Sequence, residues 1–205
     1  MVSALVCRGK LSLPAWEPFV PSRATKAQSV ERRWQRFLVN VRIRVSALYV
    51  PLVLVALSGW KPHRLYLALD TTVLWARYCM IHLSVVCCGR AVPLWWRVLE
   101  HGSATVAFGE YRGMLRKARW LLRQHGDVML DALRGFANHE LMRWLRMSRW
   151  HYGLRLPCDV LLHRPRRFPT MVSSLYPPLG QARLDRHVGL WLDGVHRCNA
   201  RSSKR

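Results

Sequence analysis

The stretch Leu65-Tyr66-Leu67-Ala68-Leu69-Asp70 is a compact apolar run that closes on a carboxylate. Lys61-Pro62 precedes the run and Thr71-Thr72 follows it, so polar residues and a proline bound it. A short apolar run between such boundaries is typical of a strand buried in a sheet. We therefore expect a central strand over residues 65–70, with Asp70 at its carboxyl end.

Two further apolar runs, 80–88 and 91–99, come after this strand. The break between them, Gly89-Arg90, is a two-residue turn that begins with glycine, and such turns are typical of hairpins. Three consecutive strands are therefore expected before the pattern changes.

A helix is expected next, because apolar residues recur at helical spacing from Phe108 until Gly126 stops the pattern. The apolar positions are Phe108, Tyr111, Leu115, Ala118 and Leu122. Four arginines, termed the arginine ridge, repeat this spacing on an adjacent face: Arg112, Arg116, Arg119 and Arg123. Because the acids that commonly pair with such a row are missing, two interpretations stay open, a solvated face and a phosphate-binding surface.

A fourth strand is expected over 128–133, followed by a tight junction at 134–136 and a helix that Asn138 caps. Residues 150–156 alternate between apolar and polar, which predicts a fifth strand. The order of three strands, helix, strand, helix and strand predicts an α/β fold. Beyond Pro157, further prolines indicate loops and short strands, and the chain ends in a polar, basic tail.

The N-terminal part is expected to be helical, with Ser29 as a cap. One face of this helix carries Val30, Trp34, Phe37, Leu38 and Val41, and the other sides carry Arg32, Arg33, Arg36 and Arg44. This basic face is interpreted as solvated or as a DNA contact. The uncharged run 45–60 contains Pro51 and is short for a membrane span, so we interpret it as buried core.

The charge balance limits the partners. The 205 residues include 33 Lys and Arg against 11 Asp and Glu, a net charge of +22. Such a field favours a polyanion, nucleic acid or an anionic membrane, over a neutral metabolite. Codon bias is an equal explanation for the excess of Arg over Lys, but it does not explain the shortage of acids.

The cysteines and the N-terminus bear on the compartment. The six cysteines form no CxxC pair, so buried thiols are expected rather than a zinc site. Residues 1–10 have no secretory pattern, which favours the cytoplasm. Motifs of serine hydrolases, zinc proteases and phosphate-binding loops are missing.

The strand order, with an aspartate that closes the first strand, resembles the ribonuclease-H-like core of polynucleotidyl transferases. Several blocks are similar to the DDE transposases of the insertion-sequence-four group. These blocks are Glu31–Asn40, Leu67–Thr72, Arg134–Leu141, Trp150–Arg155 and Val188–Asn199. The resemblance implies a ribonuclease-H-like mixed sheet flanked by helices, duplex DNA as partner, and strand cleavage and transfer with Mg²⁺ or Mn²⁺.

This chemistry uses two ions about 4 Å apart, which need several carboxylates. Asp70 matches the family's first aspartate, and the second should stand immediately before Arg134-Gly135-Phe136, where this sequence has Leu133. Asp131 lies on the same strand face, roughly 6.6 Å away along the strand, and is the candidate substitute ligand. Asp70 and Asp131 are therefore the candidate catalytic and metal-binding residues.

The resemblance also implies a third acid on a later helix, which we expect this chain to lack. Tyr152, Arg155, Asp159 and Arg166 imitate the spacing of that motif, but Pro157 excludes one helix through them. Glu140 is expected to favour the dipole of its own helix instead. Metal binding is therefore expected to be weak or absent.

We expect three regions: a helical part over 1–60, a partial ribonuclease-H-like core over 61–156, and an irregular, insertion-like part with a basic tail over 157–205. The function expected is that of a truncated, inactive transposase. The alternative is a non-catalytic DNA-binding remnant that binds or interferes at transposon ends, and a weaker one is a protein of the membrane surface. DNA contacts are expected at Arg32, Arg33, Arg36, the arginine ridge and Arg134. A second copy of the chain or an intact transposase is the further partner, with localisation in the cytoplasm at the nucleoid.

Overall fold

The computed structural model describes residues 13–19, 27–60, 64–191 and 196–203. Contacts divide the chain into two compact units, Met1–Leu52 and Val53–Arg205. The boundary between these units lies inside one helix. Three parts of the chain that the sequence analysis used lie outside the described residues: residues 1–10, Lys61-Pro62, and residues 192–195 of the last family-like block.

The first unit contains α2 (Leu13–Trp16), the 3₁₀ turn η1 (Glu17–Phe19) and α3 (Ala27–Leu38). The ring of Trp16 packs against Trp34, with 5.4 Å between centroids. Val30 and Trp34 are buried, whereas Phe37, Leu38 and Val41 are exposed. The expected apolar face is therefore correct in its first half only. Ser29 does not cap the helix, because α3 begins two residues earlier, at Ala27.

The helix α4 (Val45–Ser58) corrects the expectation of a buried core segment. Only Val53 and Leu57 are buried on it, and Leu48, Leu52 and Val55 are exposed. A helix that is apolar all round gives no sequence signal for the side that is covered. Among the described helices, none is long and apolar enough to cross a membrane.

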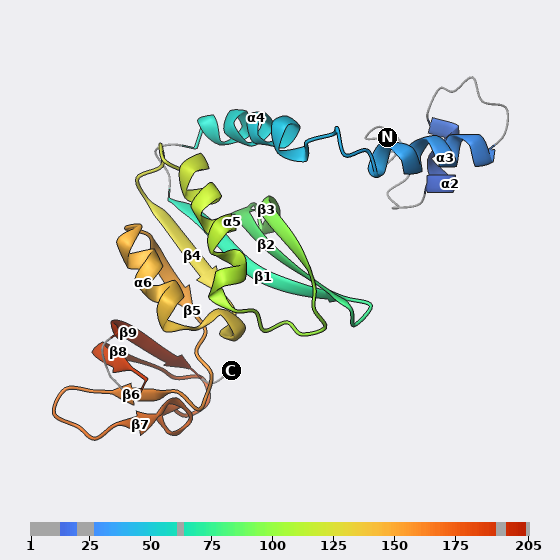
Figure 1. Cartoon of the computed structure of the whole chain (residues 1–205). Helices are drawn as coiled ribbons and strands as arrows, with labels where there is room; N and C mark the ends of the chain where they lie inside the picture. The colour runs from blue at the N-terminus through green and yellow to red at the C-terminus, as the bar shows by residue number, and fades with distance from the viewer. Residues whose placement is uncertain (1–12, 20–26, 61–63, 192–195, 204–205) are drawn as a thin grey trace. The chain divides into compact units, whose positions relative to one another are not determined.

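The second unit contains a mixed sheet of five strands and its helices, so the expected α/β class is confirmed. The strands are β1 (Leu65–Leu74), β2 (Tyr78–Cys87), β3 (Arg90–Glu100), β4 (Val128–Ala132) and β5 (His151–Leu154). Their order is β3-β2-β1-β4-β5, and β1 lies in the centre, as expected. It pairs antiparallel with β2 and parallel with β4, which in turn pairs parallel with β5 (Figure 1).

The β2–β3 hairpin turns one residue earlier than expected. Cys87 pairs with Arg90, so the two turn residues are Cys88 and Gly89 rather than Gly89 and Arg90. Both have positive φ, +49° and +73°. This is the backbone of a type I′ turn, whose twist matches that of the strands it joins.

Two helices lie on one face of this sheet (Figure 1): α5 (Phe108–Leu121) and α6 (His139–Met147). Leu65, Leu67 and Leu69 of β1 are buried on the inner face, as the alternation of a strand requires. The helices cover them with side chains of the expected face, including Tyr111 and Leu115.

Between β4 and α6 the chain makes the expected tight junction, η2 (Arg134–Phe136). Asn138 then caps α6, because its Oδ1 accepts a hydrogen bond from the backbone N–H of Leu141 at 2.8 Å. Glu140 lies in the first turn of this helix, as expected.

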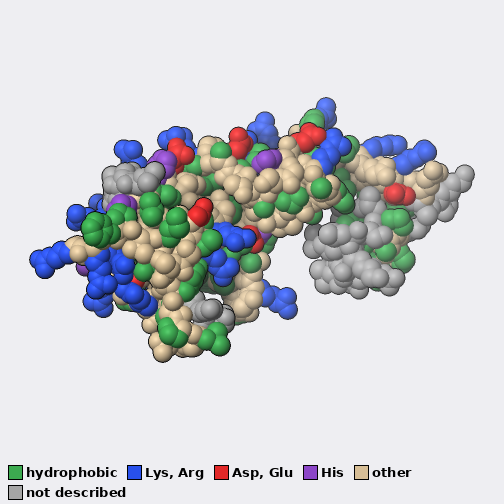
Figure 2. Space-filling view, turned by 90° about the horizontal axis from the view of Figure 1, so that it is seen from below, with side chains coloured by type: hydrophobic (Ala, Val, Ile, Leu, Met, Phe, Trp, Pro, Cys, Tyr) green, Lys and Arg blue, Asp and Glu red, His purple; other side chains and the backbone are tan. Residues whose placement is uncertain are grey.

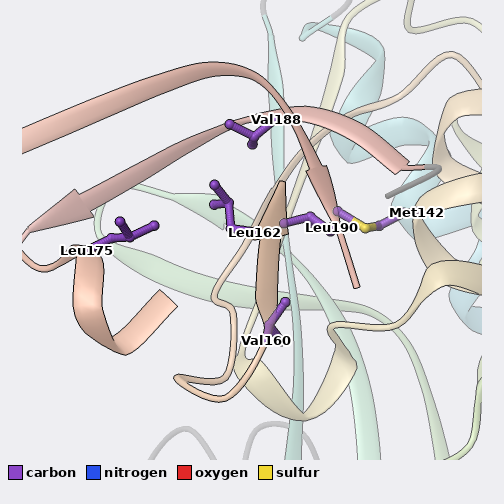
Figure 3. Close-up of a cluster of buried hydrophobic side chains, with 6 residues drawn as sticks. All are labelled: Met142, Val160, Leu162, Leu175, Val188 and Leu190. Carbon is purple, nitrogen blue, oxygen red and sulfur yellow. The ribbon is translucent and has the colours of Figure 1, made fainter. Parts of the chain in front are cut away.

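The region 157–205, expected to be irregular, instead forms a second sheet. Its strands are β6 (Leu161–His163), β7 (Thr170–Met171), β8 (Ala182–Leu190) and β9 (His196–Ser203), in the order β7-β6-β8-β9, with the turn η3 (Val172–Leu175). Six buried side chains form its core (Figure 3): Met142, Val160, Leu162, Leu175, Val188 and Leu190. They come from distant, short segments, so no local periodicity indicated them.

Candidate nucleic-acid and metal site

Asp70 and Leu133 lie side by side just beyond the last pair of the β1–β4 register. Leu133 follows the end of β4, but Asp70 lies in the middle of β1, which continues to Leu74, so the expected strand end at Asp70 is wrong. The last pair of the parallel register is Leu69 with Ala132, and Asp70 and Leu133 each follow by one residue. The pairing expected between residues 65–70 and 128–133 is therefore confirmed. The position that faces Asp70 across the parallel pair carries an apolar side chain that is 47% exposed.

His82 is the other neighbour of Asp70, and sequence reasoning missed it. It pairs with Asp70 across the antiparallel β1–β2 register, and its Nδ1 lies 3.4 Å from the hydroxyl of Ser84. Residues paired in register share a face, so His82 and Asp70 both point away from the helices. The signal that could have found His82 is the register of the β1–β2 hairpin. The position of its turn fixes which residues of the two strands face each other.

Asp131 shares this face but does not converge on Asp70. Its strand partners are Ala68 on β1 and Gly153 on β5, which places it two residues before Leu133. Its Oδ1 lies directly over Gly153, where a Cβ would overlap it. The carboxylate thus leans toward β5, away from β1. Partial burial raises the pKa of Asp131.

The carboxylate of Asp70 is engaged locally. Its Oδ1 accepts a hydrogen bond from the backbone N–H of Thr71 at 2.8 Å. Within the described residues, no group of three His, Cys, Asp or Glu side chains gathers as metal ligands. The Asp131 carboxylate lies over Gly153, and the Asp70 carboxylate is held by the backbone of Thr71. These two carboxylates do not fit a close pair of divalent ions, which requires several converging oxygens.

The residues considered for the third acid are spread over different elements. Tyr152 lies on β5, whereas Asp159 and Arg166 lie in turns after Pro157. These residues therefore share no helix, as the proline predicted. Glu140 points from the first turn of α6, where an acid favours the positive end of the helix dipole.

Arg112, Arg116 and Arg119 of the arginine ridge lie on α5, as their spacing predicted, whereas Arg123 lies in the turn that follows the helix, because α5 ends at Leu121 rather than near Gly126. All four of its side chains are exposed, and no described acid lies within ion-pair distance of them. The acid of the helix, Glu110, instead pairs with Arg97 of β3 at 3.1 Å. The ridge therefore keeps its positive charge without an internal counterion.

Aromatic side chains accompany these cations. The guanidinium of Arg123 lies 4.5 Å from the ring centroid of Trp120, which is 56% exposed, and Lys117 lies 5.1 Å from that of Trp95. Such contacts hold a cation without neutralising it. Figure 2 shows Lys and Arg side chains at many places on one face, with acidic side chains interspersed among them.

The other arginines expected to contact DNA lie elsewhere. Arg32, Arg33 and Arg36 are exposed on α3, in the first unit. Arg134, in η2, lines a cavity of about 730 Å³ together with Tyr152 of β5 and Cys198 of β9. Burial raises the pKa of both Tyr152 and Cys198. No local pattern of residues indicated this cavity, because its walls come from both sheets.

No model of a known protein family matches this chain, and no curated protein matches it either.

Proposed function

We propose that this protein binds duplex DNA through the arginine ridge of α5 and has a ribonuclease-H-like core similar to that of insertion-sequence-four transposases. The observation that carries the proposal is the ridge itself: four exposed arginines at helical spacing without described acidic partners. Duplex phosphates supply the negative charge that the ridge lacks, and the release of the cations condensed on the duplex drives association.

The strand order β3-β2-β1-β4-β5 and the place of Asp70 support the ribonuclease-H-like part of this proposal. In such a core, an aspartate at the end of the central strand would lie beside a second aspartate on the neighbouring parallel strand. Leu133 stands at that second position, and Asp131 leans toward β5. The chain by itself is therefore proposed to bind DNA without cleaving it.

The DNA-binding part is tested on the full chain by measuring duplex affinity as a function of salt. Replacing Arg112, Arg116, Arg119 and Arg123 by Gln should reduce the slope of log K against log salt by up to about 3.6, since each neutralised phosphate contributes roughly 0.9. The matched control replaces four other exposed arginines, Arg90, Arg166, Arg167 and Arg186, and lowers the net charge equally. An equal change in both variants would assign binding to overall charge rather than to the ridge.

The second test concerns the site beside Asp70. Leu133→Asp places a second carboxylate opposite Asp70, and because Leu133 is half exposed the change costs little packing. We expect the variant to bind Mn²⁺ more tightly than the wild type in a calorimetric titration. Neither protein should nick supercoiled plasmid, because a close pair of ions needs further ligands.

Metal-dependent nicking by the wild type that disappears in Asp70→Ala would overturn the proposal of an inactive chain. It would favour the second candidate function, a metal-dependent nuclease or transposase. The observation in favour of that candidate is that Asp70, His82 and Asp131 share one sheet face. The ridge experiment is independent of this outcome.

A further inference from the structure

Two adjacent thiols lie at the tip of the β2–β3 hairpin. Cys87 is the last residue of β2 and is half-buried, and Cys88 is the first turn residue and is exposed. Their sulfur atoms are 3.6 Å apart, with the thiol of Cys87 donating to Cys88. The turn backbone, with positive φ at Cys88 and Gly89, holds both side chains at the open end of the hairpin.

This geometry suits a one-atom bridge better than a disulfide. Neighbouring Cα atoms are about 3.8 Å apart across a trans peptide, whereas ordinary disulfides join Cα atoms about 4.4–6.8 Å apart. A direct bond between Cys87 and Cys88 would therefore be strained. A single thiophilic atom that binds both sulfurs leaves them close to their present separation, so the backbone keeps its conformation.

We propose that Cys87 and Cys88 form a chelating dithiol site for trivalent arsenicals. Arsenic(III) is a soft, pyramidal centre that takes thiolate ligands, and the adjacent thiols offer two of them from one direction. The reaction with an arsonous acid, R–As(OH)₂, forms two As–S bonds and breaks two As–O bonds. Both thiol protons leave with the two hydroxides as water, so no oxidant or reductant is needed.

Cys87 and Cys88 differ from the other described cysteines because their sulfur atoms are in contact and Cys88 is exposed to solvent. Cys79 is buried within the sheet, and burial raises the pKa of its thiol. Cys158 is exposed, like Cys88, so it reports what one accessible thiol does. Two linked binding groups typically gain about 10²–10⁴-fold in affinity over one. Chelation at Cys87 and Cys88 is therefore separable from simple thiol reactivity.

The probe is phenylarsine oxide, added to the reduced full chain and followed by intact mass and titration. The wild type should retain one equivalent in excess monothiol and release it to 1,2-ethanedithiol. Cys87→Ser and Cys88→Ser should each weaken binding by about 100-fold or more, because one As–S bond replaces two. Cys158→Ser is the matched control, because Cys158 is an exposed single thiol, and Cys7→Ser is a second control outside the described residues. Both variants should bind as the wild type does.

Three outcomes would overturn the assignment: no adduct in the wild type, unchanged binding by Cys88→Ser, or loss of binding in either control. Cys88 is an exposed turn residue, so its replacement by Ser leaves the fold intact, and a matching circular dichroism spectrum checks this. If Cys87→Ser misfolds, Cys88→Ser alone decides the result. DNA binding plays no part in the readout, so the two proposals fail or stand separately.

Discussion

The side chains of Asn138 and Tyr111 connect α5, η2 and α6. The side chain of Asn138 caps α6 through Leu141 and also donates to the hydroxyl of Tyr111 at 3.0 Å. The ring of Tyr111 is fully buried and meets Phe108 and Phe136 edge to face. One amide thus fixes the start of α6 and satisfies the polar end of a core aromatic side chain. Both roles stabilise the junction that follows β4.

Tyr111 predicts a loss of stability at alkaline pH. Burial raises the pKa of Tyr111 to about 12. The hydrogen bond from Asn138 lowers this pKa and the charge of Glu140 raises it, but burial is the largest effect. The unfolded chain releases this proton near pH 10, so the stabilisation is complete below pH 10 and is lost as the pH rises toward 12. A difference of two pKa units between the folded and the unfolded chain corresponds to about 2–3 kcal/mol in the free energy of unfolding.

Urea unfolding at pH 9 and at pH 11.5 measures this effect. Between the two pH values, the free energy of unfolding of the wild type should fall by about 2 kcal/mol more than that of Tyr111→Phe. Tyr176 is half exposed, so Tyr176→Phe is the control and should follow the wild type. Parallel curves for the wild type and Tyr111→Phe would show that the phenol is not shielded.

Among the structural elements, the β2–β3 hairpin requires a glycine at its turn, whereas α5 contains a glycine that its backbone does not require. Gly89 has a φ of +73° in the type I′ turn, a region that side chains with a Cβ rarely adopt. Gly113 lies within α5, and a Cβ added there meets no atom within 4 Å. The same substitution is therefore strained in the turn and free in the helix.

The substitutions Gly89→Ala and Gly113→Ala are expected to change the free energy of unfolding in opposite directions. Gly89→Ala should lower the free energy of unfolding by about 1–2 kcal/mol, because alanine pays the cost of the left-handed region. Gly113→Ala should raise it by about 0.5–1 kcal/mol, because alanine is the better helix former. Chemical denaturation of both variants beside the wild type measures the two changes. A stabilising Gly89→Ala would contradict the turn geometry.

At the scale of the molecule, the second unit depends on a core that both of its sheets share. Met142 of α6 belongs to the same buried cluster as Leu162 of β6 and Leu190 of β8 (Figure 3). Tyr152 and Leu154 of β5 pack against this cluster. The second sheet is therefore attached to the first through apolar side chains rather than through a linker alone.

Leu190→Ala should therefore destabilise the whole unit by about 2–5 kcal/mol, the usual cost of a cavity in a core. Because Met142 loses a neighbour, amide hydrogen exchange should also speed up in α6. Leu184→Ala on the same strand is the control, since Leu184 is 55% exposed and should change the stability by less than about 0.5 kcal/mol. Faster exchange confined to β6–β9 would mean that the second sheet unfolds on its own.

Features that depend on neighbours along the chain could be predicted from the amino-acid sequence. Short apolar runs predicted β1 to β4, alternation predicted β5, and a spacing of three to four residues predicted α5 and α6, because backbone geometry ties these patterns to each element. The strand that carries Asp70 and the spacing of the arginine ridge could be predicted in the same way, although β1 continues beyond Asp70 to Leu74. Features that depend on residues far apart in the chain became visible in the folded structure alone. It placed His82 beside Asp70, leaned Asp131 over Gly153, assembled the second sheet from short segments and left much of α4 exposed. Strand register and core packing bring distant residues together, and no local period encodes which partner covers an apolar surface.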